Sequence, residues 1–286
     1  MIAPGLRRRI VLVCVVASVS APCAGLARSD AADVSAWVGN SRSSLRLIAG
    51  TQTTGQGFLR AGIEIKLAPG WKTYWRYPGD SGIAPRFDFA RSTNVQSVAV
   101  QWPAPHAWRD DAGTAIGYKG NVILPLRVVP QNPAQPVELA LAFDYAICER
   151  VCIPESGNTA LRLPASAADH DAALAAAEAS VPKQSAVGAD ANLTIRAVKR
   201  EGEWPHPRIV VEVAAPAGES VDLFAEGPSA DWALPLPEPA GEAREGVRRF
   251  AFDIDGVPPG VDAKGATLRL TAVAGSNAVE VPFRLD

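Results

Sequence analysis

The chain has 286 residues, of which 48% are hydrophobic and 20% are charged. This length and composition suit one large or two ordinary globular domains, and they exclude a chain that is disordered throughout. The formal net charge is −2, so no basic stripe is available to neutralise phosphates, and no nucleic-acid partner is expected. Gly and Pro each occur 24 times, which is typical of many turns between short strands.

The first 27 residues have the features of a cleaved secretory signal peptide. Residues 7–9 are three arginines, an apolar run over 10–19 follows, and small residues precede a cleavage point after Ala27. Cys23 also admits a lipoprotein anchor, although Pro22 stands where a small residue is expected. The apolar run is too short for an ordinary membrane span and no later stretch approaches 18 apolar residues. We therefore expect an exported, periplasmic protein that does not itself span the membrane.

Cleavage after Ala27 changes both the charge and the cysteine count. It removes three arginines and no acid, which leaves 25 basic and 30 acidic residues and a net charge of −5. Cys14 and Cys23 leave with the signal peptide, so the mature chain keeps only Cys148 and Cys152. Export places this pair in an oxidising compartment, where disulfides persist.

Residues 35–165 are predicted to form an immunoglobulin-like β-sandwich, because short strands alternate with Pro/Gly turns. A polar loop is predicted over 106–114. The aromatic residues of the third strand, Trp71, Tyr74, Trp75 and Tyr77, are expected in the core. The strands are predicted over 44–51, 57–67, 71–77, 95–102, 122–129, 137–147 and 159–163.

Residues 166–191 are predicted to be a helix and a linker, and residues 192–286 a second β-sandwich. The helix is expected over 166–181, because Ser166 and Asp169 give a start signal of capping-box type and Pro182 ends it. The fold class is therefore all-β, with two immunoglobulin-like sandwiches joined by a short helix. Strands of the second sandwich are predicted over 193–198, 208–214, 221–225, 247–254, 267–273 and 278–285.

Cys148 and Cys152 lie where one predicted strand turns toward the next. A disulfide in an exported protein is usually a structural staple, but a loop of about five residues gains only roughly 2 kcal/mol from the cross-link. Strain in a tight loop also makes a disulfide easier to reduce. A redox-active pair and a structural staple are both compatible with this spacing.

A metal site is the third alternative for the two thiols. Cu(I) or Zn(II) would need further ligands, and the mature chain offers only His106, His170 and His206 and no methionine. We expect neither a metal nor another cofactor. A Gly-x-Ser-x-Gly nucleophile elbow is also absent from the sequence.

Four charged or polar residues beside the cysteines are candidates for a supporting role. Glu149 and Arg150 lie between the cysteines, and their effects on a thiolate would be opposite. Asp144 and Tyr145 precede the pair and could transfer protons or have a purely structural role at the strand end.

A set of motifs in fixed order resembles the N-terminal periplasmic domain of the DsbD family of thiol:disulfide interchange proteins, including its ScsB-like copper-tolerance branch. The resemblance covers about 35–165 well, whereas the second sandwich is similar to the extra domain of the ScsB-like branch. The motifs are Gly70–Trp75, Pro78–Gly82, Trp102–Pro105, Gly117-Tyr118, Leu124–Leu126, and Tyr145 with Cys148, Cys152 and Pro154.

The resemblance implies an immunoglobulin-like domain that relays electrons between a membrane electron transporter and thioredoxin-like periplasmic proteins, as a protein-disulfide reductase without a cofactor. Cys152 would be the attacked and attacking sulfur, and Cys148 the resolving thiol. A cap loop shields the pair in the family, and the matching residues here are Trp108, Arg109, Asp110, Asp111, Ala112 and Gly113. The chain would be a stand-alone form, without membrane or thioredoxin domains of its own.

A different class remains open beside this relay. The chain could be a non-catalytic periplasmic binding or chaperone module, in copper tolerance or cytochrome c maturation, with a structural disulfide. The reduction potential of the cysteine pair separates the two classes.

Overall fold

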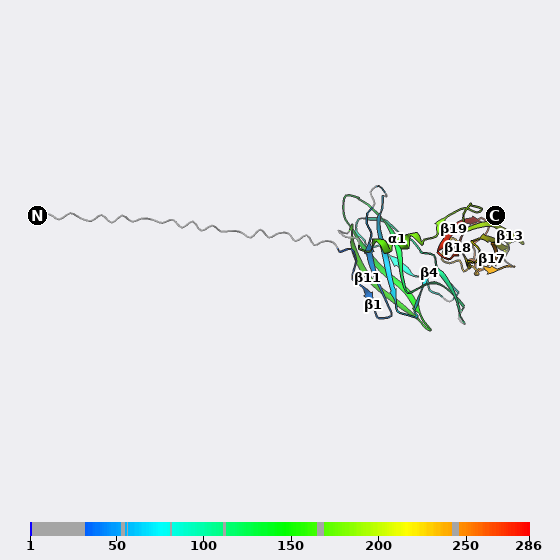
Figure 1. Ribbon diagram of the computed structural model, residues 1–286, viewed down its shortest axis with the longest axis horizontal. Helices are drawn as coiled ribbons and strands as arrows, with labels where there is room; N and C mark the ends of the chain where they lie inside the picture. The colour runs from blue at the N-terminus through cyan, green and yellow to red at the C-terminus, as the bar shows by residue number, and fades with distance from the viewer. Residues whose placement is uncertain are drawn as a thin grey trace. The chain divides into compact units, whose positions relative to one another are not determined.

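The computed structural model describes residue 1 and residues 32–286, except 53–54, 56, 81, 111–112, 165–168 and 242–245. The signal peptide expected over 1–27 lies outside the described residues, apart from Met1. The described chain is all-β with one short helix, and its strands form two immunoglobulin-like sandwiches (Figure 1). None of the described helices is long and apolar enough to cross a membrane.

The first sandwich consists of two sheets, formed by β1 to β11. One sheet has the strand order β1-β2-β3-β9-β6, and the other has the order β11-β10-β4-β8-β7, with β5 paired to β10. The strands are β1 Val38–Gly39, β2 Ser43–Ala49, β3 Leu59–Leu67, β4 Lys72–Gly79, β5 Arg86–Asp88, β6 Val95–Val100, β7 His106–Asp110, β8 Gly113–Lys119, β9 Asn121–Pro130, β10 Val137–Cys148 and β11 Cys152–Leu163.

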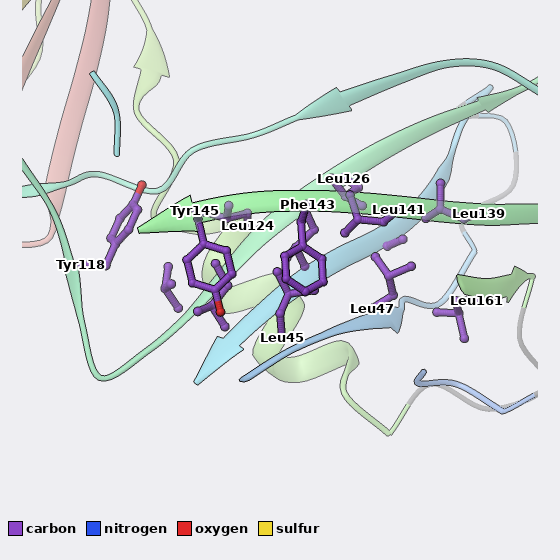
Figure 2. Packing of buried hydrophobic residues seen from close by; sticks show 14 of the residues in the cluster. Leu45, Leu47, Tyr118, Leu124, Leu126, Leu139, Leu141, Phe143, Tyr145 and Leu161 are labelled. Carbon is purple, nitrogen blue, oxygen red and sulfur yellow. The ribbon is translucent and has the colours of Figure 1, made fainter. Parts of the chain in front are cut away.

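The core of the first sandwich lies between these two sheets. Alternate residues of β10 point into it, since side chains along a strand alternate between the two faces of a sheet. Phe143 and Tyr145 of β10 project toward Leu45 and Leu47 of β2 (Figure 2). Leu45, Leu47 and Trp75 have no exposed surface, so this cluster is a fully formed core.

The helix α1, Asp171–Ala179, is held against the first sandwich by charge and packing. Arg60 of β3 pairs with Asp171 at 2.7 Å and with Glu178 at 2.7 Å, near the two ends of the helix. Leu174 is fully buried. The helix begins later than predicted: Asp169 lies in a turn, and the N-cap residue is His170, without a side-chain cap. Ser166 of the predicted start lies outside the described residues.

The second sandwich is formed by the sheets β12-β19-β18-β15 and β13-β14-β17-β16, with β18 beside β19 in Figure 1. It has its own core, which includes Trp232, Phe252 and Leu270. The strands are β12 Lys183–Gln184, β13 Thr194–Glu201, β14 Arg208–Ala214, β15 Val221–Glu226, β16 Glu238–Pro239, β17 Val247–Asp253, β18 Thr267–Ala274 and β19 Asn277–Arg284.

The prediction of a polar loop over 106–114 is wrong. His106–Asp110 form β7, which pairs with β8 as an antiparallel hairpin. Trp108 accounts for much of this difference, because its ring packs near His106 and under the ammonium group of Lys119, which lies 4.6 Å from the ring centroid. These contacts favour a strand although the local sequence is polar.

Candidate redox site

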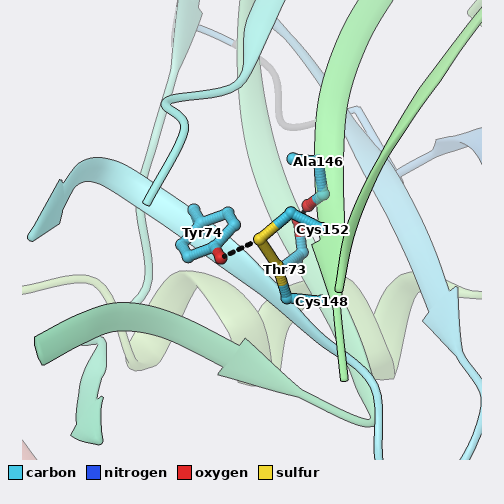
Figure 3. The surroundings of a disulfide bond; sticks show 5 residues. All are labelled: Thr73, Tyr74, Ala146, Cys148 and Cys152. Atoms are coloured by element: carbon cyan, nitrogen blue, oxygen red, sulfur yellow. Dashed lines mark hydrogen bonds between the residues drawn. A yellow bond between two sulfur atoms is a disulfide. The ribbon is translucent and has the colours of Figure 1, made fainter. Parts of the chain in front are cut away.

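The two cysteines close the hairpin formed by β10 and β11. Cys148 is the last residue of β10 and Cys152 the first of β11, and the two are register partners with 4.2 Å between their Cα atoms. They form a disulfide that encloses the three-residue turn 149–151 (Figure 3). Twelve register pairs, ending at Val137 and Leu163, hold the two strands together below the turn.

Strand alternation places the disulfide on the face of the sheet opposite the main core. Tyr145 and Ile147 belong to the large core cluster, whereas Ala146 and Cys148 belong to a small separate cluster with Tyr74 and Ala115. The side chain of Thr73, on β4, donates a hydrogen bond of 2.9 Å to the carbonyl of Ala146. This bond ties β4 to the strand end that carries the disulfide.

The two cysteine residues differ in their exposure to solvent. Cys148 is only 4% exposed, because it packs within the small cluster beside Tyr74. Cys152 is exposed. A thiol exchange partner must reach a sulfur along the S–S axis, and exchange rates depend on which sulfur is accessible. The arrangement therefore presents Cys152 and protects Cys148.

The hydroxyl of Tyr74 lies 3.3 Å from the Sγ atom of Cys152 (Figure 3). A disulfide sulfur carries no hydrogen, so the phenol is the donor in this contact. The ring of Tyr74 is only slightly exposed, and a Cβ atom added to Gly82 would lie 2.7 Å from it. The chain at Gly82 therefore packs against the tyrosine that contacts the exposed sulfur.

Two lysines, Lys72 and Lys119, follow the disulfide on neighbouring strands and form a short basic row across the sheet. Cys148 is the register partner of Lys72 on β4, and Lys72 is the register partner of Lys119 on β8. Register partners in antiparallel strands carry their side chains on the same face. Lys72 and Lys119 therefore lie on the face of the sheet that carries the disulfide.

Tyr145 is buried away from the disulfide. Its hydroxyl lies 2.6 Å from the Oγ atom of Ser43, and its ring packs against Phe143 with 5.7 Å between the ring centroids. Burial raises the pKa of Tyr145, and the hydrogen bond with Ser43 opposes this rise. These contacts give Tyr145 a place in the core of the sandwich.

The other predicted residues near the cysteines are exposed. Asp144 lies on β10, and Glu149 and Arg150 lie in the turn between the cysteines. The carboxylate of Glu149 lies over Gly70, where an added Cβ atom would be 2.9 Å from Oε1. Val151, the last residue of the turn, is 70% exposed. The turn thus offers two residues of opposite charge, Glu149 and Arg150, and one apolar side chain, Val151, beside Cys152.

The residues predicted as a cap loop are divided between two strands. Trp108, Arg109 and Asp110 belong to β7 and Gly113 begins β8, whereas Asp111 and Ala112 lie outside the described residues. The ring of Trp108 meets Lys119, at the far end of the basic row that begins beside Cys148.

Sequence reasoning missed the contact of Tyr74 with Cys152. Tyr74 was expected in the core, and it does lie only 2% exposed, but in the small cluster with Cys148 instead of the main one. Its neighbour Trp75 lies in the main core. The alternation along β4 could have shown that one of two adjacent aromatic residues must face away from the core.

The fold and this site define an immunoglobulin-like sandwich protein with a half-exposed disulfide at the tip of a long hairpin. Residues 46–164 match the family described as the N-terminal part of the thiol:disulfide interchange protein DsbD. This match begins within β2 and ends one residue after β11, so it covers most of the first sandwich and none of the second.

A solved structure of similar fold covers more of the chain. It is the crystal structure of the N-terminal periplasmic domain of ScsB from Proteus mirabilis, with a TM-score of 0.67 and 22% sequence identity. The match covers 88% of this chain and 98% of that one, so the similarity of fold extends over both sandwiches. No curated protein sequence matches the chain.

Proposed function

We propose that the chain is a periplasmic thiol:disulfide interchange protein that relays electrons between redox partner proteins through Cys148 and Cys152. The observation that carries this proposal is the unequal exposure of the two cysteine residues, with Cys152 exposed and Cys148 buried. Thiol exchange needs a cysteine that a partner can reach, and Cys152 meets this requirement. The DsbD N-terminal family match over 46–164 supports the same class of chemistry.

The exchange needs no cofactor. In the reduced protein, the Cys152 thiolate attacks a partner's disulfide, a new S–S bond forms, and the partner's other sulfur leaves as a thiolate that takes a proton from water. The Cys148 thiolate then attacks the sulfur of Cys152, and the second partner sulfur leaves in the same way. Two electrons and two protons pass to the partner, and the Cys148–Cys152 disulfide is restored.

The residues around the pair would assist these steps. The phenol of Tyr74 and the basic row that begins with Lys72 stabilise negative charge on sulfur. The segment 108–113 is proposed to shield the pair between reactions. The partners we propose are thioredoxin-like periplasmic proteins and a membrane electron transporter, which would reduce the pair again.

Trapping of mixed disulfides tests the relay. The reduced Cys148→Ser variant, mixed with an oxidised thioredoxin-like protein, should accumulate a disulfide-linked complex through Cys152. The Cys152→Ser variant should form none, and the wild-type chain should pass through the complex without accumulating it. Equal trapping by the two variants, or trapping by neither, would refute the proposed roles.

The reduction potential of the pair separates the relay from the rival class. A potential in the range of glutathione and thioredoxin supports exchange, whereas a value below about −300 mV indicates a structural disulfide. The latter result would favour a non-catalytic binding or chaperone module.

A further inference from the structure

Strand β4 runs from the disulfide to the second sandwich. Near its start, Lys72 is the register partner of Cys148, and Tyr74 contacts the sulfur of Cys152. The next three residues, Trp75, Arg76 and Tyr77, each contact a residue of the second sandwich. Tyr74 therefore lies directly between the reactive sulfur and a segment held by the other sandwich.

The strongest of these contacts is made by Arg76. Its guanidinium group donates two hydrogen bonds, 2.8 and 2.7 Å long, to the carboxylate of Glu226. It also forms an ion pair with Glu280. All three side chains are at least four-fifths buried. A planar guanidinium group held by two buried carboxylates has little freedom to move, because the bidentate geometry fixes its orientation.

Trp75 and Tyr77 add two contacts on either side of Arg76. The ring of Trp75 packs against Phe224 with 5.6 Å between centroids, and the guanidinium group of Arg76 lies 4.4 Å from the centroid of the Trp75 ring. The hydroxyl of Tyr77 donates a hydrogen bond to the carbonyl of Leu234. Three consecutive residues of one strand are thus fixed by the second sandwich.

The pairing of β4 with its neighbour β8 is interrupted at the same place. Lys72, Thr73 and Tyr74 are in register with β8, and the next register pair is Gly79 with Ala115. The four residues in between have no register partner on β8, so the ladder does not fix their position. Directly after Tyr74, contacts with the second sandwich hold β4 where its pairing with β8 is interrupted.

We propose that Arg76 is a positioning residue for the redox site: through its ion pairs with Glu226 and Glu280, the second sandwich holds β4 so that the hydroxyl of Tyr74 stays at the sulfur of Cys152. The inference rests on the proposed redox function for its biological meaning, but the geometry that it describes is independent of any partner. It gives the second sandwich a role at a site to which it contributes no residue.

The hydrogen bond matters most after the disulfide is reduced. A phenol that donates to a thiolate stabilises the charged form, so more of Cys152 is reactive at a given pH. A small displacement of β4 would lengthen the bond, and a hydrogen bond weakens steeply with distance and angle. Loss of the Arg76 contacts should therefore reduce the reactivity of a sulfur that Arg76 does not touch.

The test measures the rate at which iodoacetamide modifies Cys152 in the reduced full-length chain, as a function of pH. The variants are Tyr74→Phe, Arg76→Met, Arg76→Lys and the double variant of Tyr74→Phe with Arg76→Met. In Arg76→Met the two glutamates keep Arg269, at 3.9 and 3.4 Å, as a partner. Arg60→Met is the matched control, since Arg60 also holds two carboxylates but lies on β3.

We expect Tyr74→Phe to slow the reaction about tenfold below the midpoint of the pH profile and to move that midpoint upward by about one unit. Arg76→Met should move it in the same direction, with a rate loss of about threefold or more. Arg76→Lys should restore part of the loss. The double variant should be no slower than Tyr74→Phe alone, and Arg60→Met should keep the wild-type profile.

A wild-type profile in Arg76→Met overturns the proposal, and so does a rate loss in the double variant that equals the product of the two single losses. If Arg76→Met does not fold, the pH profile of Cys152 alkylation in Arg76→Lys becomes the deciding measurement. This variant keeps the positive charge and loses the bidentate geometry. These rates require no partner protein. Failure of mixed-disulfide trapping with an intact Tyr74–Arg76 coupling would therefore count against the relay alone.

Discussion

Cys148 and Cys152 are register partners across the same hairpin, yet Cys148 is 4% exposed and Cys152 is open to solvent. The difference arises because Cys148 ends a central strand and packs beside Tyr74, whereas Cys152 begins a strand at the edge of the sheet. The fold alone therefore decides which of two chemically identical groups an incoming molecule can reach.

The first prediction concerns the relative reactivity of the two thiols. In the reduced protein, iodoacetamide should modify Cys152 about tenfold faster than Cys148, since reactivity follows exposure and thiolate character. Trypsin cleaves after Arg150, between the two cysteines, so mass spectrometry can quantify each on its own peptide. In urea the two rates should converge, and a difference that persists there would show that local sequence, not burial, controls the rates.

The second prediction separates a structural from a chemical role for Tyr145. Tyr145→Phe removes the partner of the buried Ser43 hydroxyl, at 2.6 Å, and should lower the free energy of unfolding by about 1–3 kcal/mol. The alkylation rate of Cys152 should stay at the wild-type value. A slower reaction with unchanged stability, measured by urea denaturation, would instead indicate that Tyr145 transfers protons at the site.

The third prediction is a loss of stability in alkali that depends on Tyr77. Burial raises the pKa of Tyr77 to about 12, and the charges of Asp80 and Glu226 add to the rise. The folded protein therefore keeps this proton between pH 10 and 12 while the unfolded chain loses it, so stability decreases as the pH rises through this range. The decrease from this one group should be about 1.4 kcal/mol per pH unit.

Urea denaturation of wild-type and Tyr77→Phe proteins at several alkaline pH values checks this. Below pH 10 the variant should be less stable by about 1 kcal/mol, because the hydrogen bond to Leu234 is lost. The gap should close at about pH 11 and then reverse, because only the wild-type chain has this proton to lose on unfolding. The buried Tyr118 and Tyr145 are present in both proteins, so their contributions cancel, and a constant gap would contradict the assignment.

The fourth prediction concerns acid and the attachment of α1. A hydrogen bond from the backbone N–H of Thr51 lowers the pKa of Asp171 against the effect of burial, and Arg60 lowers it further. The stabilising contribution is therefore present above the ordinary pKa of 3.8 and is lost as the pH falls below it. Asp171→Asn should lower the free energy of unfolding by about 1 kcal/mol at pH 7. Between pH 7 and pH 3, the free energy of unfolding of this variant should decrease less than that of the wild-type protein.

Asp253→Asn provides the control for this measurement. Asp253 pairs with Arg208 at 3.4 Å, but both side chains are more than half exposed, so its removal should change the stability very little. An equal loss in the two variants would show that the contacts at α1 contribute no more than an ordinary surface ion pair.

Much of the fold could be predicted from the sequence, because its strands carry clear local signals. The predicted strand at 208–214 coincides with β14, and the predicted strand at 137–147 is one residue shorter than β10. Period-two hydrophobic alternation and Pro/Gly turns are local features, so they can be recognised in the sequence alone. The position of the cysteine pair at the turn of a hairpin followed from the same signals.

The features that the sequence did not predict depend on contacts between residues that are distant in sequence. The strand β7 is stabilised by Lys119 against the ring of Trp108, which no local pattern in 106–114 reveals. The start of α1 is fixed by Asp171 bonding to Thr51 and Arg60, not by a capping residue. The contact of Tyr74 with Cys152 joins residues 78 positions apart, so it required the pairing of β4 with β10.

The short separation of the two cysteines has a consequence for the energetics of oxidation and reduction. The disulfide joins residues only 4 positions apart, so it removes little freedom from the unfolded chain. In a thermodynamic cycle that links oxidation to unfolding, the oxidised and reduced forms should then differ little in stability. By the same cycle, the reduction potential of the pair in the folded protein should lie close to that of the same pair in the unfolded chain.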